Sequence, residues 1–482
     1  MNREAFIGRS EQLKGLELLL SKKTATLVVV RGRRRIGKSR LIQEFAREKR
    51  FLSFSGLPPT AKQGSGVKLQ RQEFVRQLNQ YANLPGLKAD DWGDLLTLLA
   101  EQTKSGRVVI LLDEISWMAE KDETFLGKLK IVWDLHFKKN PELILVLCGS
   151  VSSWIEKNIL NSTEFFGRIG HKVDLDELSL VESKELLRAN GFQNSAMETF
   201  MMLSIAGGVP WYLELMNSSL SAINNIKQLC FVKSGILVEE FLHIFHDLFQ
   251  NRSELYIKIV RYLSAGPATY KSISEAIAYK TGSPLTSYLN DLTTAGFLEK
   301  DYIWSFKTGK ERSIFCYRLS DNYLRFYLSF VEPNIAKINK NQYKQLSLTT
   351  FPGFNSIMGL QFENVVLKNR ELILDLLGIS SEEVVADNPY YQTQTKRQQG
   401  CQIDYLIQTK FNTLFVCEIK FSRREVGVAV CKEVEAKCQK LVKGKNFVTV
   451  PVLIHVNGVT AELEDKGYFT KIINFSDLLK MQ

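Results

Sequence analysis

The decapeptide RGRRRIGKSR limits the fold of this chain more than any other stretch. It follows the apolar run Leu27 to Val30, which is typical of a short buried β-strand, and it precedes a segment with helical periodicity. Gly32 and Gly37 bracket four residues, and Lys38 and Ser39 follow, so the pattern is G-x-x-x-x-G-K-S. Glycines allow a tight loop whose backbone N–H groups point at phosphate oxygens. The pattern therefore predicts a strand, loop and helix that bind a polyphosphate.

ATP and Mg²⁺ are the expected ligands of this loop. Lys38 would reach the β- and γ-phosphates, and the hydroxyl of Ser39 would bind Mg²⁺. The helix after the loop would turn its positive N-terminal end toward the anion. A basic surface turn is the alternative interpretation until a second motif supports the first. The loop residues expected to contact the nucleotide are Gly32, Arg35, Ile36, Gly37, Lys38 and Ser39.

A second motif, GRVVILLDEIS, follows about 75 residues later. Val108 to Leu112 predict another buried strand, which ends in Asp113 and Glu114. Asp113 suits a contact to Mg²⁺ through water or a neighbouring ligand, and Glu114 suits a base that polarises the attacking water. A strand that ends in a solvated turn would show the same letters. Their position after a phosphate-binding loop favours ATP hydrolysis.

Strand-like runs alternate with helical patterns through the first 180 residues or so, which predicts an α/β fold with a parallel sheet and helices on both faces. Ser150 follows the fourth run. There it would lie beside the γ-phosphate and could sense it; a compatible alternative is that it caps the helix predicted by VSSWIEKNIL. The expected strands are residues 27–30, 50–56, 108–112, 143–150 and 171–178.

The composition is that of an ordinary globular protein, and 482 residues are enough for about three domains. No apolar stretch approaches the roughly 20 residues that cross a bilayer, and no apolar signal region opens the chain. We therefore expect no membrane contact. The seven cysteines form no C-x-x-C pair, so we expect a cytoplasmic protein with reduced thiols. Of the net charge of +11, residues 251–350 contribute +6, with 14 basic and 8 acidic residues, which indicates an anionic partner there.

Four segments resemble the archaeal-type ATPases within the AAA+/STAND group. FIGRSEQLKGLELLL resembles their N-terminal box, which implies that Arg9 lies near the adenine. GRRRIGKS resembles their arginine-rich P-loop, and AGGVPWYLEL resembles the Gly-x-Pro motif of STAND lids. FFGRIGHKVDLDELS resembles the Gly-Arg segment after their sensor strand. Arg168 is then a candidate transition-state arginine for its own or a neighbouring nucleotide, with a structural salt bridge as the alternative.

Arg33, Arg34 and Arg35 are more than phosphate binding requires, because backbone amides and one lysine suffice. They either form salt bridges to acidic side chains of the lid or of a partner domain, or contact phosphate or nucleic acid directly. Both alternatives stay open at the level of the sequence.

Residues 254–321 predict three helices followed by a β-hairpin, the order of a winged helix-turn-helix. Ser283 is the expected N-cap of the third helix, with Pro284 in its first position. In such folds the third helix can enter the major groove of DNA and the hairpin can contact phosphates. STAND ATPases often use winged helices for internal packing, which is the alternative. The candidate groove residues are Thr286, Ser287 and Asn290, and the candidate phosphate contacts are Lys307, Lys310 and Arg312.

The C-terminal region, after a connector expected from residue 321 to residue 350, carries a second set of chemical residues. Glu363 lies on a predicted helix, Asp404 in a predicted strand, and Glu418 and Lys420 in the next strand. Strand period two places Glu418 and Lys420 on one face. Carboxylates suit Mg²⁺-assisted phosphodiester hydrolysis, in which a lysine supports the nucleophile or the developing charge.

This order, followed by a helix at 427–442 and a strand at 448–455, resembles the PD-(D/E)XK nuclease fold. An archaeal-type ATPase followed by a winged helix and this domain is a known family layout, so the resemblance covers nearly the whole chain. An inherited fold that now only binds is the alternative for the last domain. The expected domains are an ATPase core at 1–178, a helical lid at 179–250, a winged helix at 251–330, a connector at 331–350 and a nuclease-like domain at 351–482.

The sequence thus predicts an ATP-hydrolysing protein whose nucleotide state controls a module that binds DNA and cleaves it with a metal ion. The competing hypothesis is a nucleotide-driven protein switch with a non-catalytic nuclease-like domain. DNA is the expected partner, while protein partners and oligomerisation stay open. The expected catalytic residues are Glu114, Arg168, Asp404, Glu418 and Lys420, and the expected metal contacts are Ser39, Asp113, Glu363, Asp404 and Glu418.

Overall fold

The computed structural model describes residues 6–58, 66–82, 90–119, 122–193, 195–249, 253–279, 283–343, 345, 347–396 and 398–481. The chain divides into two compact units, Met1–Glu177 and Leu178–Gln482. This division falls one residue before the expected end of the ATPase core, and the further boundaries expected at residues 250, 330 and 350 stay predictions. No helix in the described ranges is both long and apolar enough to cross a membrane.

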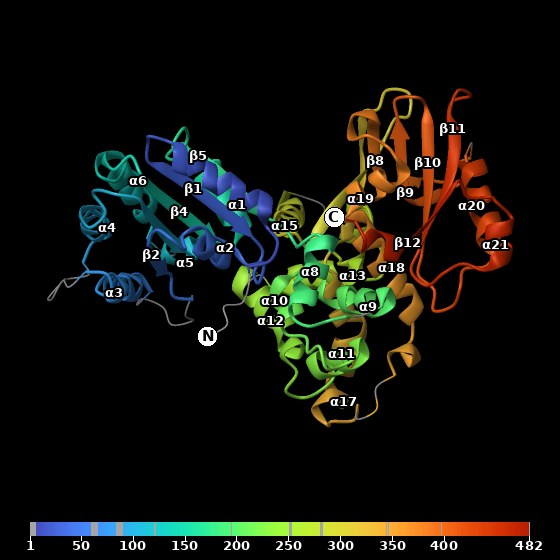
Figure 1. Cartoon of the computed structure of the whole chain (residues 1–482), viewed down its shortest axis with the longest axis horizontal. Coiled ribbons are helices and arrows are strands. Elements are labelled where there is room, and N and C mark those ends of the chain that lie inside the picture. Colours follow the sequence, from blue (N-terminus) through green and yellow to red (C-terminus); the bar gives the residue numbers. More distant parts are fainter. Residues whose placement is uncertain are drawn as a thin grey trace. The chain divides into compact units, whose positions relative to one another are not determined.

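The first unit is built on a parallel five-stranded sheet in the order β2-β3-β4-β1-β5 (Figure 1). This confirms the predicted parallel sheet. Leu27 and Val29 of β1 pack in the core on one face, and Val28 and Val30 pack in the core on the other. Burial on both faces explains why the three central strands, β1, β3 and β4, are nearly continuous apolar runs. The strands are β1 (Thr26–Gly32), β2 (Arg50–Ser55), β3 (Val108–Asp113), β4 (Leu143–Gly149) and β5 (Ile169–Leu175).

Helices cover both faces of this sheet (Figure 1). α1 (Ser10–Glu17) and α2 (Lys38–Phe45) enclose one core, and α3 (Gly66–Leu78), α4 (Trp92–Glu101) and α6 (Phe125–Leu135) enclose the other. Because the strands are parallel, their carboxyl ends lie at one edge of the sheet, where the loop before α2 meets the residues that follow β3 and β4. The short helices α5 (Ile115–Met118) and α7 (Ser152–Ile155) follow β3 and β4.

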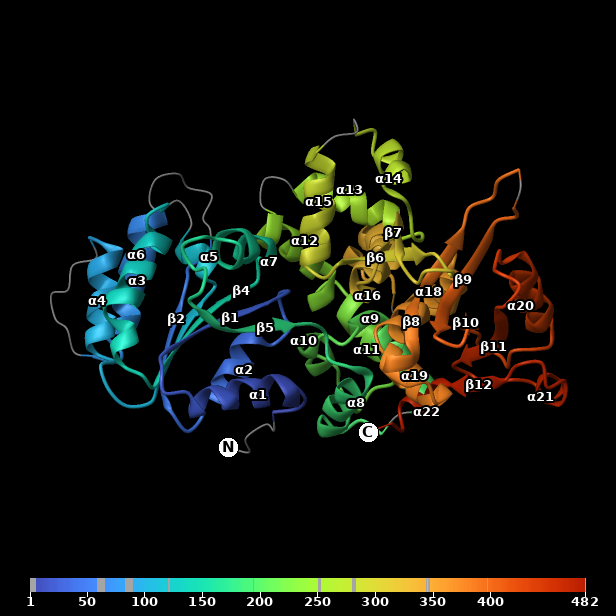
Figure 2. The ribbon, with the colours of Figure 1, turned by 90° about the horizontal axis from the view of Figure 1, so that it is seen from above.

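The second unit begins with helices and continues into three helices and a hairpin. These last elements lie together in Figure 2, and β6 pairs with β7 in antiparallel fashion. The cap expected at Ser283 depends on residues 280–282, which lie outside the described residues. The elements are α8 (Leu180–Ala189), α9 (Ala196–Ala206), α10 (Pro210–Glu214), α11 (Ala222–Cys230), α12 (Ile236–Phe249), α13 (Ser253–Leu263), α14 (Tyr270–Ala276), α15 (Ser283–Thr294), β6 (Leu298–Trp304) and β7 (Glu311–Leu319).

Residues 322–331, the first part of the segment that the sequence suggested as a connector, are largely buried. α16 (Asn322–Phe326) and most of the helical turn Tyr327–Val331 are buried, and Arg325 is only 1% exposed. Aromatic packing explains the difference, because the ring of Tyr327 stacks on that of Phe241 with 4.4 Å between their centroids. This segment therefore belongs to the core of the second unit.

A mixed five-stranded sheet in the order β12-β11-β10-β9-β8 completes the second unit (Figure 1). β8, β9 and β10 pair in antiparallel fashion, while β11 and β12 are parallel to β10. α18 (Phe354–Leu367) contacts β10, and α20 (Ala429–Lys440) contacts both β9 and β10. The remaining elements are α17 (Ile335–Asn339), α19 (Arg370–Leu377), β8 (Val384–Gln392), β9 (Cys401–Thr409), β10 (Thr413–Lys420), β11 (Val448–His455), α21 (Ala461–Asp465), β12 (Lys471–Asn474) and α22 (Phe475–Leu478).

Candidate functional site

The loop between β1 and α2 has a backbone conformation that its two glycines allow. Gly32 has φ +155°, and a Cβ atom there would lie 2.4 Å from the carbonyl oxygen of Leu175. Gly37 has φ +90°, a conformation that side chains rarely adopt. Arg35 also has a positive φ, 68°. The geometry of the loop therefore requires glycine at both ends of the pattern.

Lys38 and Ser39 lie in the first turn of α2. Nζ of the buried Lys38 donates hydrogen bonds to the carbonyl oxygens of Gly32 at 2.9 Å and Arg33 at 3.0 Å. Oγ of Ser39 donates to Oδ2 of Asp113 at 2.5 Å. The sheet thus brings together Lys38, which can bind phosphates, and the side-chain oxygens of Ser39 and Asp113, which are ligands that Mg²⁺ prefers.

Glu114 follows β3 in a left-handed conformation, with φ 49°. Its Oε2 accepts hydrogen bonds from the backbone N–H of Ser150 at 3.1 Å and from Oγ of Ser150 at 2.8 Å. Ser150 does not cap the following helix, because the N-cap position of α7 is Val151; that alternative is wrong. A positive φ at a non-glycine residue costs about 1–3 kcal/mol and is concentrated at functional sites. The strained backbone favours a catalytic role for Glu114.

Two arginines connect the phosphate loop to residues at the end of the first unit. Arg9 is 6% exposed and donates to the carbonyl oxygens of Ile36 at 3.3 Å and Asp176 at 2.5 Å. Arg33 pairs with Glu177 at 3.1 Å, and their side chains are 6% and 9% exposed. For Arg33 this is the salt-bridge alternative, with a partner at the end of the ATPase unit. The proximity of Arg9 to adenine stays a prediction.

Arg168 lies just before β5, at the amino-terminal edge of the sheet. β5 is parallel to β1, and Ile169 pairs with Leu27, so this edge is opposite the phosphate loop, roughly 20 Å away along the strand. The Nε and Nη2 atoms of Arg168 donate to the carboxylate of Asp134 at 3.1 and 2.7 Å. The placement is inconsistent with contact to the nucleotide of its own chain. The salt-bridge alternative is present, and contact with a neighbouring nucleotide stays a prediction.

Four side chains from β9, β10 and α20 form what we call the carboxylate–lysine cluster: Asp404, Glu418, Lys420 and Lys437. Glu418 is 2% exposed, and its two carboxylate oxygens lie 2.9 Å from Nζ of Lys420 and 2.5 Å from Nζ of Lys437. Nζ of Lys437 also lies 3.6 Å from Oδ1 of Asp404. Oδ2 of Asp404 accepts a hydrogen bond from the backbone N–H of Ile419 at 3.0 Å. Three of the four members are residues predicted from the sequence.

Lys437 is absent from the predicted set. It lies on α20 one turn after Glu433, whose Oε2 accepts a hydrogen bond from Nζ of Lys420 at 2.9 Å. Residues four apart share one face of a helix. The spacing of Glu433 and Lys437 on the helix after the E-x-K motif was therefore the available signal.

The electrostatics of the cluster favour a cation. Burial, followed by the charge of Glu418, raises the pKa of Asp404 to about 6. Burial, followed by the charge of Asp404, raises the pKa of Glu363 to about 8. Burial opposes the charge of Lys420, but Glu418 and Glu433 raise the pKa of Lys420 above its ordinary value. Added positive charge would stabilise the ionised carboxylates.

The expected set of three metal-binding carboxylates is not assembled. Across the described residues, no three His, Cys, Asp or Glu side chains form a group that could hold a metal ion. The ammonium of Lys437 lies between the carboxylates of Asp404 and Glu418 instead. Two carboxylates that converge on one cation fit a single Mg²⁺ ion, provided that Lys437 moves aside.

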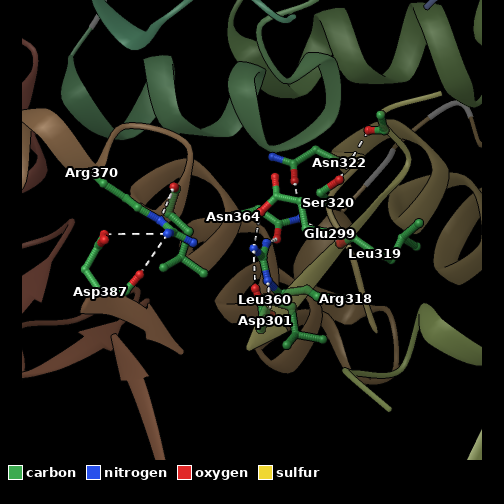
Figure 3. Close-up of polar contacts among 12 residues, drawn as sticks. Glu299, Asp301, Arg318, Leu319, Ser320, Asn322, Leu360, Asn364, Arg370 and Asp387 are labelled. Carbon is green, nitrogen blue, oxygen red and sulfur yellow. Dashed lines mark hydrogen bonds and ion pairs between the residues drawn. The ribbon is translucent and has the colours of Figure 1, made fainter. Parts of the chain in front are cut away.

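A buried polar cluster attaches α18, which carries Glu363, to the hairpin of β6 and β7 (Figure 3). Arg318 of β7 is 2% exposed and donates to Oδ2 of Asp301 at 2.8 Å and to Oδ1 of Asn364 at 2.7 Å. Nδ2 of Asn364 in turn donates to the carbonyl oxygen of Leu319 at 3.0 Å. Breaking such a buried pair typically costs about 3–5 kcal/mol. The position of Glu363 therefore depends on the hairpin.

The hairpin also packs against the C-terminal sheet. Nε1 of Trp304 donates to Oε1 of Gln408 at 2.6 Å, and Nε2 of Gln408 donates to the carbonyl oxygen of Phe306 at 2.8 Å. A Cβ atom on Gly309 would lie 2.5 Å from Cγ1 of Val385. These contacts favour the packing interpretation for the body of the hairpin. The side chains predicted to contact DNA are nevertheless exposed: Thr286, Ser287, Asn290, Lys307, Lys310 and Arg312.

Residues 6–216 match the family described as "ATPase domain predominantly from Archaea". This match supports the prediction of an ATPase domain in the first part of the chain. An uncharacterized protein of Methanocaldococcus jannaschii is 24% identical over 389 residues, which cover 77% of this chain and 78% of that protein. A Walker-type ATPase of Pyrococcus abyssi is similar in structure over 68% of this chain and 97% of its own, with 18% identity and a TM-score of 0.48. The Aeropyrum pernix ORC2 protein in ADPNP–ADP complexes is similar over 71% and 97%, with 14% identity and a TM-score of 0.40.

Proposed function

We propose that the ATPase domain hydrolyses Mg²⁺-bound ATP and that its nucleotide state controls the rest of the chain, which binds DNA and cleaves it with a divalent metal. The observation that carries the cleavage part is the carboxylate–lysine cluster. The carboxylates of Asp404 and Glu418 converge there on the ammonium of Lys437, and burial, followed by the charge of Glu418, raises the pKa of Asp404 to about 6. Such a set is costly for stability, which favours a chemical role.

In the ATP site, each side chain has one task. The ammonium of Lys38 exchanges the carbonyl oxygens of Gly32 and Arg33 for the β- and γ-phosphates. Ser39 and Asp113 would hold Mg²⁺, which neutralises phosphate charge when bound. Glu114 orients the attacking water, and the two hydrogen bonds from Ser150 hold its carboxylate in place. Arg168 would act only on the nucleotide of a neighbouring subunit in an oligomer.

In the cleavage site, Asp404 and Glu418 would hold the metal. Burial, followed by the charge of Asp404, raises the pKa of Glu363 to about 8. Bound Mg²⁺ would supply activation of water and neutralisation of charge. Lys420 stays protonated between Glu418 and Glu433 and places its charge beside the phosphate to be cleaved. When no metal is bound, the ammonium of Lys437 occupies the position that the metal ion would take between Asp404 and Glu418.

The finer assignments of the second unit belong to the same proposal. Helices at 179–250 form a lid, residues 251–330 form a winged helix whose α15 and hairpin contact DNA, and residues 331–350 connect it to a PD-(D/E)XK-like domain at 351–482. The exposed basic side chains of the hairpin support contact with phosphates. We also propose a cytoplasmic location for the protein.

A second candidate function is a nucleotide-driven protein switch with a non-catalytic nuclease-like domain. The packing of Trp304 and Gln408 favours it, because a hairpin that holds a neighbouring sheet is a scaffold. The two functions differ in their response to salt, since phosphate contacts release counterions and a protein scaffold does not.

To decide between the nuclease and the protein switch, the purified protein is incubated with plasmid, linear and branched DNA. Each DNA is tested with Mg²⁺ or Mn²⁺, and with or without ATP. We expect metal-dependent cleavage that Asp404→Ala, Glu418→Ala and Lys420→Ala each eliminate while ATP hydrolysis persists. Asp375→Ala removes an exposed carboxylate of α19 and is the matched control. A wild-type protein that cuts no DNA form under any of these conditions would support the switch.

A further inference from the structure

The chain that leaves β10 after the carboxylate–lysine cluster lines a hollow of about 440 Å³. Asn355, Phe421, Ser422, Arg423 and Arg424 line it. Four of these residues directly follow Lys420, the last residue of β10, and Asn355 lies in the first turn of α18. The hollow therefore begins where the strand that carries Glu418 and Lys420 ends.

Two arginines give the hollow positive charge. Arg423 and Arg424 are exposed, and in the described part of the chain their guanidinium groups make no ion pair or hydrogen bond. The lysines of the neighbouring cluster differ, because carboxylates bind both Lys420 and Lys437. An anion in the hollow could accept bidentate hydrogen bonds from either guanidinium group.

The backbone between the arginines is held in place. Oγ of Ser422 accepts a hydrogen bond from the N–H of Arg424 at 3.1 Å, and the carbonyl oxygen of Arg423 accepts one from Nδ2 of Asn457 at 2.6 Å. The half-buried ring of Phe421 lies 5.4 Å from that of Phe200, between centroids. The lining thus combines a guanidinium pair with an anchored aromatic ring, the two groups that proteins use to bind the phosphates and stack on the bases of single-stranded nucleic acids.

We propose that this hollow is a phosphate-binding subsite for a single strand of DNA, which it holds so that a nearby phosphodiester lies on the carboxylate–lysine cluster. The inference deepens the proposed function and rests on it. Carboxylates repel an approaching phosphodiester, so a cleavage site of this kind needs positive charge next to it. The Cα atom of Arg423 is three residues from that of Lys420, at most about 11 Å, which is within a few nucleotides of a strand.

Binding can be measured without cleavage by fluorescence anisotropy of a labelled single-stranded oligonucleotide in EDTA, over a series of salt concentrations. We expect the double variant Arg423→Ala with Arg424→Ala to bind roughly tenfold more weakly at low salt. The salt slope should fall by roughly 0.7 for each phosphate that the variant no longer binds. The double variant Arg423→Lys with Arg424→Lys should retain most of the slope, because it keeps the charge. Lys466→Ala with Lys471→Ala, which removes two exposed charges elsewhere in the unit, is the matched control.

Competition with inorganic phosphate and with a mononucleotide separates a strand subsite from a site for small anions. Efficient competition by either at micromolar concentration would overturn the proposal. An alanine variant with unchanged affinity and slope would overturn it as well, even if the wild-type protein cleaves DNA. A wild-type protein that binds DNA through the arginines but does not cut it would support the subsite and contradict the nuclease. A protein that binds no DNA would contradict both.

Discussion

At the scale of single residues, hydrogen bonds hold the side chains of the candidate ATP site in place. Lys38 is bound to two loop carbonyl oxygens, Ser39 to Asp113, and Glu114 to Ser150. Each bond joins the loop or a strand end to a side chain with a different task. Substitutions at these positions should therefore separate nucleotide binding from hydrolysis.

Lys38→Ala should abolish ATP binding, because no other side chain of the loop replaces its reach to the γ-phosphate. Glu114→Gln should bind ATP normally but slow hydrolysis by roughly 10²–10⁴-fold, since glutamine keeps the shape and loses the base. Titration with a fluorescent nucleotide and assay of phosphate release measure the two effects separately. Hydrolysis by Glu114→Gln at the wild-type rate would show that another group activates the water.

Glu363→Gln should change how stability depends on pH. Burial and the charge of Asp404 raise the pKa of Glu363, while the charges of Arg325, Arg318 and Lys437 lower it, and the result is about 8 against an ordinary 4.5. The folded protein therefore holds an extra proton between these values, and stability falls as the pH rises through them, by up to about 1.4 kcal/mol for each unit. Thermal unfolding should show that the stability of the variant, relative to that of the wild type, rises between pH 5 and pH 8. An equal difference at both pH values would contradict this account.

At the scale of elements, the two sides of the hairpin of β6 and β7 lie in different environments. Its buried side packs against the C-terminal sheet through Trp304 and Phe306, and its exposed side presents Lys307, Lys310 and Arg312. One element could thus hold the C-terminal sheet and, as proposed, contact DNA at the same time. The two sides are tested by different substitutions.

Gln408→Ala should destabilise the protein by about 2 kcal/mol. The change leaves the buried N–H of Trp304 and the carbonyl oxygen of Phe306 without their partner, and the cost of such unsatisfied groups is about 1–3 kcal/mol. Denaturant unfolding measures the loss. Gln402→Ala, at an exposed position of the same strand β9, should cost little and is the control. Equal stability of the two variants would mean that the hairpin is not fixed through Gln408.

Replacing Lys307, Lys310 and Arg312 together by alanine should weaken binding to duplex DNA and reduce the salt slope by roughly 0.9 for each phosphate that is no longer bound. All three side chains are exposed, so unfolding should be unaffected, and ATP turnover without DNA should barely change. Anisotropy with a duplex at several salt concentrations is the measurement. An unchanged slope would leave the hairpin with its packing role alone.

At the scale of the whole molecule, the proposal requires that the ATPase unit regulate a site in the other unit. Lys38→Ala should retain the metal-dependent cleavage chemistry but lose its response to ATP, since the carboxylate–lysine cluster is untouched. Asp404→Ala should do the reverse, hydrolysing ATP without cutting DNA. Cleavage and phosphate release measured side by side with ATP, with ADP and without nucleotide test both. Cleavage by the wild type that is indifferent to nucleotide would refute the regulation and leave the two activities independent.

The residues that meet at the candidate ATP site could be predicted to lie together from the sequence, because their determinants are local. Gly32, Gly37, Lys38 and Ser39 lie within eight residues, and the conformation of that loop requires glycine where the pattern has it. Asp113 and Glu114 follow a continuous apolar run, and parallel strands place their carboxyl ends at one edge. Backbone sterics and burial on both faces act over short stretches, so short stretches reveal them.

What only the tertiary structure decided depends on contacts between distant segments. The sheet topology places Arg168 at the edge opposite the phosphate loop, which no local pattern encodes. The packing of α20 brings Lys437 between Asp404 and Glu418, and aromatic contacts bury the segment after β7 that reads as a connector. Side-chain pairing in a low-dielectric core depends on which charges meet across the fold, and their spacing in the chain does not determine this.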